Sequence, residues 1–338
     1  MTDQGHNIIV IGTSAGGLGV LDELIGQLPA GLPAAIFIVQ HMAPENSGEG
    51  LVHVLGRHKA FRCGLATHGE VFEKGRIYIA PPDCHLLVKE RSVLVTKGAR
   101  ENRYRPGIDP LFRSAAVSHG PRVIGVVLTG MLDDGTAGLM AIQKCGGVTL
   151  VQDPQDAAYP DMPQSALNNM QVDYCVPVSA MGRLLEKLTH EAAGESRAIP
   201  DDVRAEAEIA ERVLSDVPQV NALGNQVPYG CPNCGGVLWE MNNRDVQRFR
   251  CHTGHSFTAA ALLTSQTERI EETLWISLRM FEERRNLLNN MAQRPKISPV
   301  MKSSYEQRGR ETEVHIARIH DMLVAQETAQ DAQIPQLV

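Results

Sequence analysis

Short apolar runs alternate with amphipathic stretches over residues 7–190, and this alternation constrains the fold more than any other feature. The runs are four to six residues long and rich in Val and Ile, which is typical of buried parallel strands. The alternation predicts an α/β fold: a doubly wound, mostly parallel sheet flanked by helices. The expected strands are 8–11, 35–40, 123–128, 147–151 and 174–177, and the expected helices are 18–28, 48–57, 110–118, 136–144 and 180–190.

The rest of the chain has a different character. Residues 76–96 read as short strands around a proline pair, which suggests a hairpin. Residues 194–217 are acidic and Ala-rich, and we expect a linker helix that starts near Pro200. Beyond residue 259, apolar residues recur every three to four positions, which predicts a long helix and a second one over 312–325. These would form a helical hairpin or a dimerising coiled segment.

The expected organisation therefore has four parts. A first domain covers 5–192, an acidic helical linker covers 193–226, a small Cys/His module covers 227–258 and a helical hairpin covers 259–330.

Composition narrows the class of protein. The chain has 338 residues and a formal net charge of −7, which argues against nucleic acid or anionic lipid as the main partner. No apolar run approaches about 18 residues, so we expect no signal peptide and no membrane insertion. The chain has seven cysteines, which is an odd number, and shows no export signal. We therefore expect a reducing, cytoplasmic location in which the cysteines do not form disulfide bonds.

Three polar residues follow expected strands at the point where each strand ends. Ser14 lies in a glycine-rich turn after the first strand, His41 ends the second, and Asp134 follows the run 123–128. The carboxyl ends of parallel strands meet at one edge of a sheet, so one crevice would hold all three. Serine hydrolysis needs a base for the hydroxyl proton and a carboxylate to orient that base.

Other roles for these residues stay open at this point. Serine and aspartate commonly cap helices, so Ser14, Asp133 and Asp134 also fit that role. His41 also fits the role of a helix-capping or surface histidine. The glycine-rich turn after the first strand invites a dinucleotide-binding interpretation. That interpretation needs an acidic residue at the end of the second strand, where this chain has Gln40 and His41, and the glycine spacing does not match either.

Three blocks of the sequence resemble the active-site segments of the CheB-type protein-glutamate methylesterases of bacterial chemotaxis, and further segments resemble the family in the same order. The blocks are residues 11–17, 39–42 and 128–135, and the further segments are residues 81–86, 109–112 and 162–166. The resemblance covers about residues 5–190. It also extends to the segment 249–257 and the helix after it, which resemble the C-terminal extension of some relatives that lack a receiver domain.

The resemblance implies a role for each site residue. Ser14 matches the nucleophile, His41 the general base and acid, and Asp134 the orienting carboxylate. Met131 matches the residue whose backbone N–H helps to stabilise the oxyanion. The implied reaction is hydrolysis of glutamate γ-methyl esters on the cytoplasmic helices of chemoreceptors, with deamidation of certain receptor glutamines. No cofactor is implied for catalysis, and a methyltransferase or another signalling protein is a further expected partner.

The chain departs from the family pattern in several places. Ala15 stands where many relatives carry a hydroxyl residue, and Pro81, Pro82 and Asp83 replace a more glycine-rich segment. Thirteen residues precede Ser14, so we expect no receiver domain to restrain the enzyme. Restraint would then come from the C-terminal half or from a partner, and residues up to about 192 would fold alone as an esterase.

A second cluster of chemically reactive residues lies further along the chain. Cys231 and Cys234 form a Cys-x2-Cys pair, and Cys251 follows after sixteen residues. With a fourth ligand this is the spacing of a structural zinc site in a zinc-ribbon-like module. We prefer His255 to His252 as that ligand because adjacent ligands would strain the chain. The alternative is three reduced cysteines in a loop-rich core.

Two rival functions remain. The first is a CheB-like esterase that acts on a methylated protein outside chemotaxis. The second is a catalytically idle scaffold, against which the intact set of Ser14, His41 and Asp134 argues.

Overall fold

The computed structural model describes residues 5–213, 217–242 and 246–331, with side chains described up to residue 325. The chain divides into two compact units, Met1–Leu262 and Leu263–Val338, and each is described by itself. The finer domain boundaries expected at residues 192 and 226 stay predictions.

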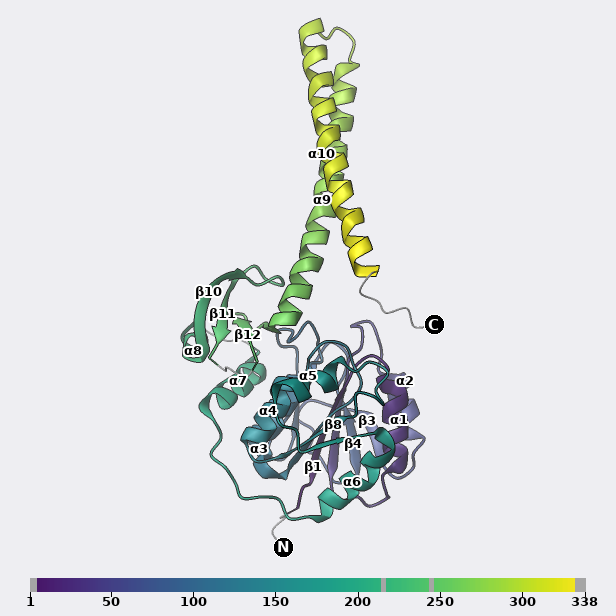
Figure 1. Ribbon diagram of the computed structural model, residues 1–338, viewed down its shortest axis with the longest axis vertical. Coiled ribbons are helices and arrows are strands. Elements are labelled where there is room, and N and C mark those ends of the chain that lie inside the picture. The colour runs from purple at the N-terminus through teal and green to yellow at the C-terminus, as the bar shows by residue number, and fades with distance from the viewer. Residues whose placement is uncertain (1–4, 214–216, 243–245, 332–338) are drawn as a thin grey trace. The chain divides into compact units, whose positions relative to one another are not determined.

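A parallel sheet lies at the centre of the first unit (Figure 1). It has seven strands, in the order β3-β4-β2-β1-β7-β8-β9. Every pair of neighbours in it runs parallel. The predicted fold class is confirmed. The strands are β1 (Ile8–Thr13), β2 (Ala35–Gln40), β3 (Arg62–Leu65), β4 (Arg76–Ile79), β7 (Val123–Val127), β8 (Val148–Gln152) and β9 (Tyr174–Val176).

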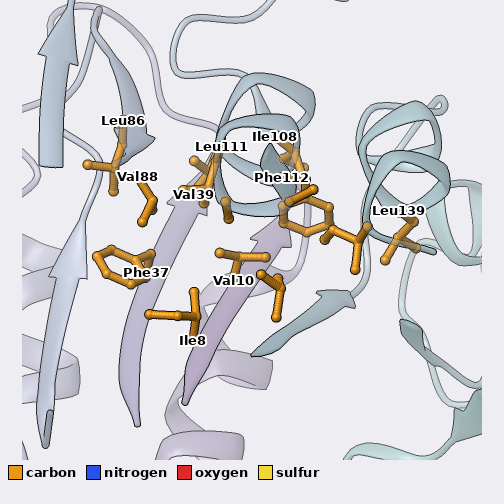
Figure 2. Packing of buried hydrophobic residues seen from close by; sticks show 14 of the residues in the cluster. Ile8, Val10, Phe37, Val39, Leu86, Val88, Ile108, Leu111, Phe112 and Leu139 are labelled. Carbon is orange, nitrogen blue, oxygen red and sulfur yellow. The ribbon is translucent and has the colours of Figure 1, made fainter. Parts of the chain in front are cut away.

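Helices cover both faces of this sheet because the strand side chains alternate between two cores. Ile8 and Val10 of β1 belong to one core cluster, and Ile9 and Ile11 to the other. Figure 2 shows Ile8 and Val10 facing the same cluster as Phe112. On that face lie α3 (Ile108–His119), α4 (Thr136–Lys144) and α5 (Asp161–Asn169), and on the other lie α1 (Gly17–Gln27), α2 (Glu49–Gly56) and α6 (Val178–His190).

The expected hairpin over residues 76–96 needs a correction. β4 joins the parallel sheet beside β2, and only β5 (His85–Val88) and β6 (Val93–Thr96) pair as a hairpin. The proline pair separates the two sets because proline cannot donate to a ladder. β3 and α5 were not predicted. The side chains of β3 are only partly buried, so this edge strand lacks the apolar run that marks a central one.

The acidic stretch expected as a linker packs against the first domain. It contains α7 (Asp201–Arg212), and Val203 of this helix belongs to the core cluster of Figure 2. Beyond it, α8 (Val217–Leu223) leads into a four-stranded antiparallel sheet. Its strands, in order, are β10 (Gly224–Gly230), β11 (Val237–Met241), β12 (Arg248–Cys251) and β13 (Ser256–Thr258). A short 3-10 helix lies at Gly120–Arg122, between α3 and β7.

Two long antiparallel helices make up the second unit. α9 (Ala259–Ala292) starts at the end of the first unit, and α10 (Pro299–Asp331) runs back beside it (Figure 1). Phe281 stacks on His315 at 5.4 Å between ring centroids. The predicted apolar stripe is only partly covered, because Leu288 is buried whereas Ile270 is exposed. Within the described residues, no helix combines the length and the apolar character needed to cross a membrane.

Candidate active site

Ser14, His41 and Asp134 lie together at the carboxyl edge of the parallel sheet. Nδ1 of His41 is 3.1 Å from Oγ of Ser14, and Nε2 is 2.9 Å from Oδ2 of Asp134. Ser14 follows β1 and Asp134 follows β7, and these two strands are neighbours. The strands that come after β1 in the chain are added first on its β2 side, and from β7 on they are added on its other side. This reversal of direction is where open α/β sheets place their sites.

The glycines of the β1–α1 turn serve close packing. A Cβ on Gly17 would overlap the side chains of Gln40 and Thr13. Gln40 donates from Nε2 to the carbonyl of Ser14 at 2.8 Å and to that of His41 at 3.1 Å. These bonds join the ends of β1 and β2. Gln40 is the last residue of β2, which is the place where a dinucleotide site would need an acidic residue. The geometry therefore gives the glycine-rich turn a role other than phosphate binding.

Asp134 is held as a carboxylate by several donors. Its oxygens accept backbone N–H bonds from Ile108 at 2.7 Å, Gly135 at 3.1 Å and Asp109 at 3.3 Å. Burial alone would raise the pKa of Asp134, but the hydrogen bond and charge of His41, with the other donors, lower it below its ordinary value. Asp134 therefore presents a negative charge to the imidazole ring.

The neighbouring carboxyl groups have different environments. Burial and the charge of Asp134 raise the pKa of Asp109 to about 7, and burial raises that of Asp133 to about 6. In the structure it is Asp134, and not Asp133, that meets His41. The carbonyl of Asp133 accepts the N–H of Thr136 at 3.3 Å, at the start of α4.

Sequence reasoning missed two residues that contact this site. Tyr104 stacks on His41, with 3.7 Å between ring centroids and 12° between planes. Asn102 donates from Nδ2 to Oδ1 of Asp134 at 2.9 Å. Both come from the loop before α3, which has no apolar periodicity. The residue type of Asn102 is a weak local signal, because asparagine tolerates the left-handed backbone region better than most residues. In the structure its φ of 47° lies in that region.

The segment that carries Met131 passes beside Ser14. A Cβ on Gly130 would lie 2.8 Å from Cβ of Ser14, so only glycine lets this backbone approach so closely. Met131 comes next, with its side chain exposed, and Leu132 has a φ of 65°. The backbone of this segment therefore passes close to the side chain of Ser14.

The second cluster brings together Cys231, Cys234, Cys251 and His255, whose ligand atoms all lie within 4.8 Å of one another. The sulfur atoms of Cys234 and Cys251 are 3.7 Å apart, and Nδ1 of His255 is 3.6 Å from the Cys251 sulfur. A tetrahedral zinc ion with bonds of about 2.0–2.3 Å would place its ligands roughly 3.5–3.8 Å apart. A hydrogen bond from Cys231 lowers the pKa of Cys251, which favours the thiolate that metals bind. These four residues could hold a metal ion.

The hydrogen-bonded line of a serine, a histidine and a buried carboxylate at a sheet edge is the arrangement that defines serine hydrolases. A family model described as CheB methylesterase matches residues 9–185. The crystal structure of the Thermotoga maritima CheB methylesterase catalytic domain is similar, with a TM-score of 0.53 and 33% identity, over 54% of this chain and 99% of that one. The chain belongs to the CheB methylesterase family.

Two relatives set the extent of the similarity. The protein-glutamate methylesterase/protein-glutamine glutaminase 2 of Methanosarcina mazei is 36% identical over 191 residues, which cover 54% of this chain and 52% of the relative. The protein of the same name from Anaeromyxobacter dehalogenans is 37% identical over 182 residues, covering 54% and 53%. This chain spans about half the length of these two curated relatives.

Proposed function

We propose that this protein is a serine esterase that hydrolyses glutamate γ-methyl esters on chemoreceptors and deamidates receptor glutamines. The observation that carries the proposal is that each ring nitrogen of His41 has a partner, one in Ser14 and one in Asp134. This line lies within the segment that matches the family model. The proposed partner is the methylated cytoplasmic helix of a receptor, and the proposed location is the cytoplasm.

In the proposed mechanism, Oγ of Ser14 attacks the ester carbonyl while Nδ1 of His41 takes the hydroxyl proton. Asp134 accepts the Nε2–H bond and stabilises the imidazolium ion that forms. The backbone N–H of Met131 stabilises the oxyanion. His41 then donates this proton to the leaving methoxide, which departs as methanol, or to the leaving amide nitrogen, which departs as ammonia when the substrate is a glutamine. A water molecule, deprotonated by His41, hydrolyses the glutamyl–Ser14 ester and releases a free carboxylate.

We further propose that the Cys/His cluster holds a structural zinc ion. Four protein ligands leave no open position for substrate, so the ion would stabilise the small sheet and take no part in the chemistry. The catalytic residues then need no cofactor.

Methanol release from a methylated receptor fragment tests the proposed function. The intact protein should release methanol in proportion to the new carboxylates formed, and the Ser14→Ala variant should not. If the intact protein hydrolyses small esters but leaves the fragment untouched, the substrate lies outside chemotaxis. If it hydrolyses neither, the chain is an idle scaffold.

A further inference from the structure

The side chain of Asn102 links Asp134 of the candidate active site to the four-stranded sheet β10–β13, which carries the Cys/His cluster and is called the Cys/His module below. Its Nδ2 donates to Oδ1 of Asp134 and to Oδ2 of Asp109, both at 2.9 Å, and its Oδ1 accepts the backbone N–H of Thr258 at 3.1 Å. Every hydrogen-bonding group of this buried amide is thus engaged. Two of its bonds point to carboxylates of the esterase domain, and the third comes from β13.

β13 follows directly after the cluster that could hold a metal. Cys251 ends β12 and His255 precedes β13, so two of the four ligand residues bracket the turn between these strands. In that turn, the N–H of Cys251 donates to the carbonyl of His255 at 2.9 Å. The carbonyl of Ser256, the next residue, accepts the N–H of Asn102 at 2.8 Å. The turn that an ion would close therefore positions both the backbone and the side chain of Asn102.

A buried cluster of charged side chains also connects the loop that carries Asn102 to the Cys/His module. It consists of Glu101, Arg113, Glu206, Arg248 and Arg250. Oε1 of Glu101 is 3.2 Å from Nη2 of Arg250 on β12, and its Oε2 is 2.5 Å from Nη2 of Arg113 on α3. Glu101 precedes Asn102 directly, so the loop is attached to the module at two consecutive residues.

We propose that Asn102 is a positioning residue of the esterase and that the Cys/His module holds it in place, so that a metal ion in the cluster sets the orientation of Asp134. This inference rests on the proposed esterase function. Asn102 acts through Asp134: it fixes one carboxylate oxygen while the other meets His41. A misplacement of about 1 Å in such a supporting group costs on the order of 10²-fold in rate.

Substitution of Asn102 tests the positioning role. Asn102→Ala should lower kcat for a small ester by about 10²-fold while KM changes little, because the amide acts on the transition state through Asp134. Asn102→Asp should lower kcat further, since it places a third carboxylate beside Asp109 and Asp134. The matched control is Asn290→Asp, an exposed asparagine on α9, which should leave both constants unchanged.

The role of the metal ion is tested with the full chain loaded with zinc, before and after treatment with a chelator. Two readouts are recorded: kcat, and the proton resonance of Nε2–H of His41, which is assigned by its loss in His41→Gln. Removal of zinc should shift this resonance and lower kcat in the wild-type protein. In Asn102→Ala, removal of zinc should change neither further, because the two perturbations share one path. Cys234→Ser should behave as the stripped protein does, whereas Cys175→Ser, an exposed cysteine on β9, should behave as wild type.

Several outcomes would overturn the proposal. One is a stripped wild-type protein whose resonance and kcat are unchanged. Another is an equal loss of kcat on stripping in the wild type and in Asn102→Ala, which would mean that the module acts by a path other than Asn102. A failure of the proposed function looks different: the wild-type protein would then leave the methylated receptor fragment untouched, or hydrolyse no ester at all, while the resonance still reports on the coupling.

Discussion

The site formed by Ser14, His41 and Asp134 and the Cys/His cluster are both polar sites in the first unit, but they are held by different means. Asp134 accepts backbone N–H bonds from Ile108, the first residue of α3, and from Gly135, which caps α4. Both helices are anchored in a large hydrophobic core. The ligands of the Cys/His cluster lie on short turns beside a much smaller core. The Cys251 sulfur lies against the Cys234 sulfur and Nδ1 of His255, which are themselves members of the cluster.

The difference concerns what each site requires in order to form. Helix N-termini offer free N–H groups to an anion, so the Asp134 carboxylate is stabilised by the fold itself. Several thiolates in one place repel one another unless a cation lies between them. The first site should therefore be preformed, and the second should depend on an ion.

The largest expected effect concerns the preformed site. Ser14→Ala should lower kcat by about 10⁴-fold or more, because it removes the nucleophile. The melting temperature should change by less than about 2 °C, because only one hydroxyl is lost from an edge that the core supports. Activity assays and calorimetry on the same preparation check both statements. Retained activity would place the nucleophile at another residue.

The next effect concerns the buried ion cluster that joins the two regions. Glu206→Ala should destabilise the protein by about 3–5 kcal/mol, because it leaves buried arginines without their carboxylate. Denaturant unfolding measures this change. Glu208→Ala, on the more exposed side of α7, should cost less than about 1 kcal/mol. Equal effects of the two substitutions would mean that the buried pairs do not hold the regions together.

A smaller effect is expected from the turn that carries Ser14. Gly17→Ala should cost about 1–3 kcal/mol of stability, because its Cβ would overlap Gln40 and Thr13. Gly19→Ala, two residues further along α1, should instead stabilise the protein by about 0.5–1 kcal/mol, because nothing lies near its Cβ. Thermal unfolding of both variants decides the point. A Gly17→Ala protein as stable as wild type would show that the turn is not tightly packed.

The smallest expected effect is the dependence of stability on pH. Burial opposes the charge of Glu101 and Glu206, but the arginines around them lower the pKa of both below the ordinary value of 4.5. A depressed pKa contributes stability that is complete above the unfolded value and is lost as pH falls toward the folded one. Between pH 7 and pH 4, Glu206 should therefore lose about 1 kcal/mol of its stabilising contribution, and Glu101 should change in the same direction. Glu206→Gln should lack its share of that loss, and an unchanged pH dependence would contradict this assignment.

The sequence predicted the elements that obey a simple period. Ser14, His41 and Asp134 were found because each follows a strand, and the sheet brings those ends together. Asn102 was not found because its partners lie in separate parts of the chain and its loop has no periodicity. Local sequence carries no record of such long-range contacts.

Glu206 illustrates the same limit in the acidic stretch. An Ala-rich helix with many acidic residues reads as a solvated linker, yet this one carboxylate is buried among arginines from α3 and β12. Without it and Arg250, the segment up to residue 192 would leave Arg113 and Glu101 incompletely paired. The structure therefore gives a reason against the expectation that this segment folds alone.

Covalent trapping of the nucleophile tests the central claim most directly. The intact protein is treated with a fluorophosphonate ester, and the modified residue is located by peptide mass spectrometry. One label per chain, on Ser14, is expected, with none in Ser14→Ala and much slower labelling in Asp134→Asn, because the carboxylate that orients His41 is lost. Labelling at another residue, or equal rates in the wild-type and Asp134→Asn proteins, would contradict the account.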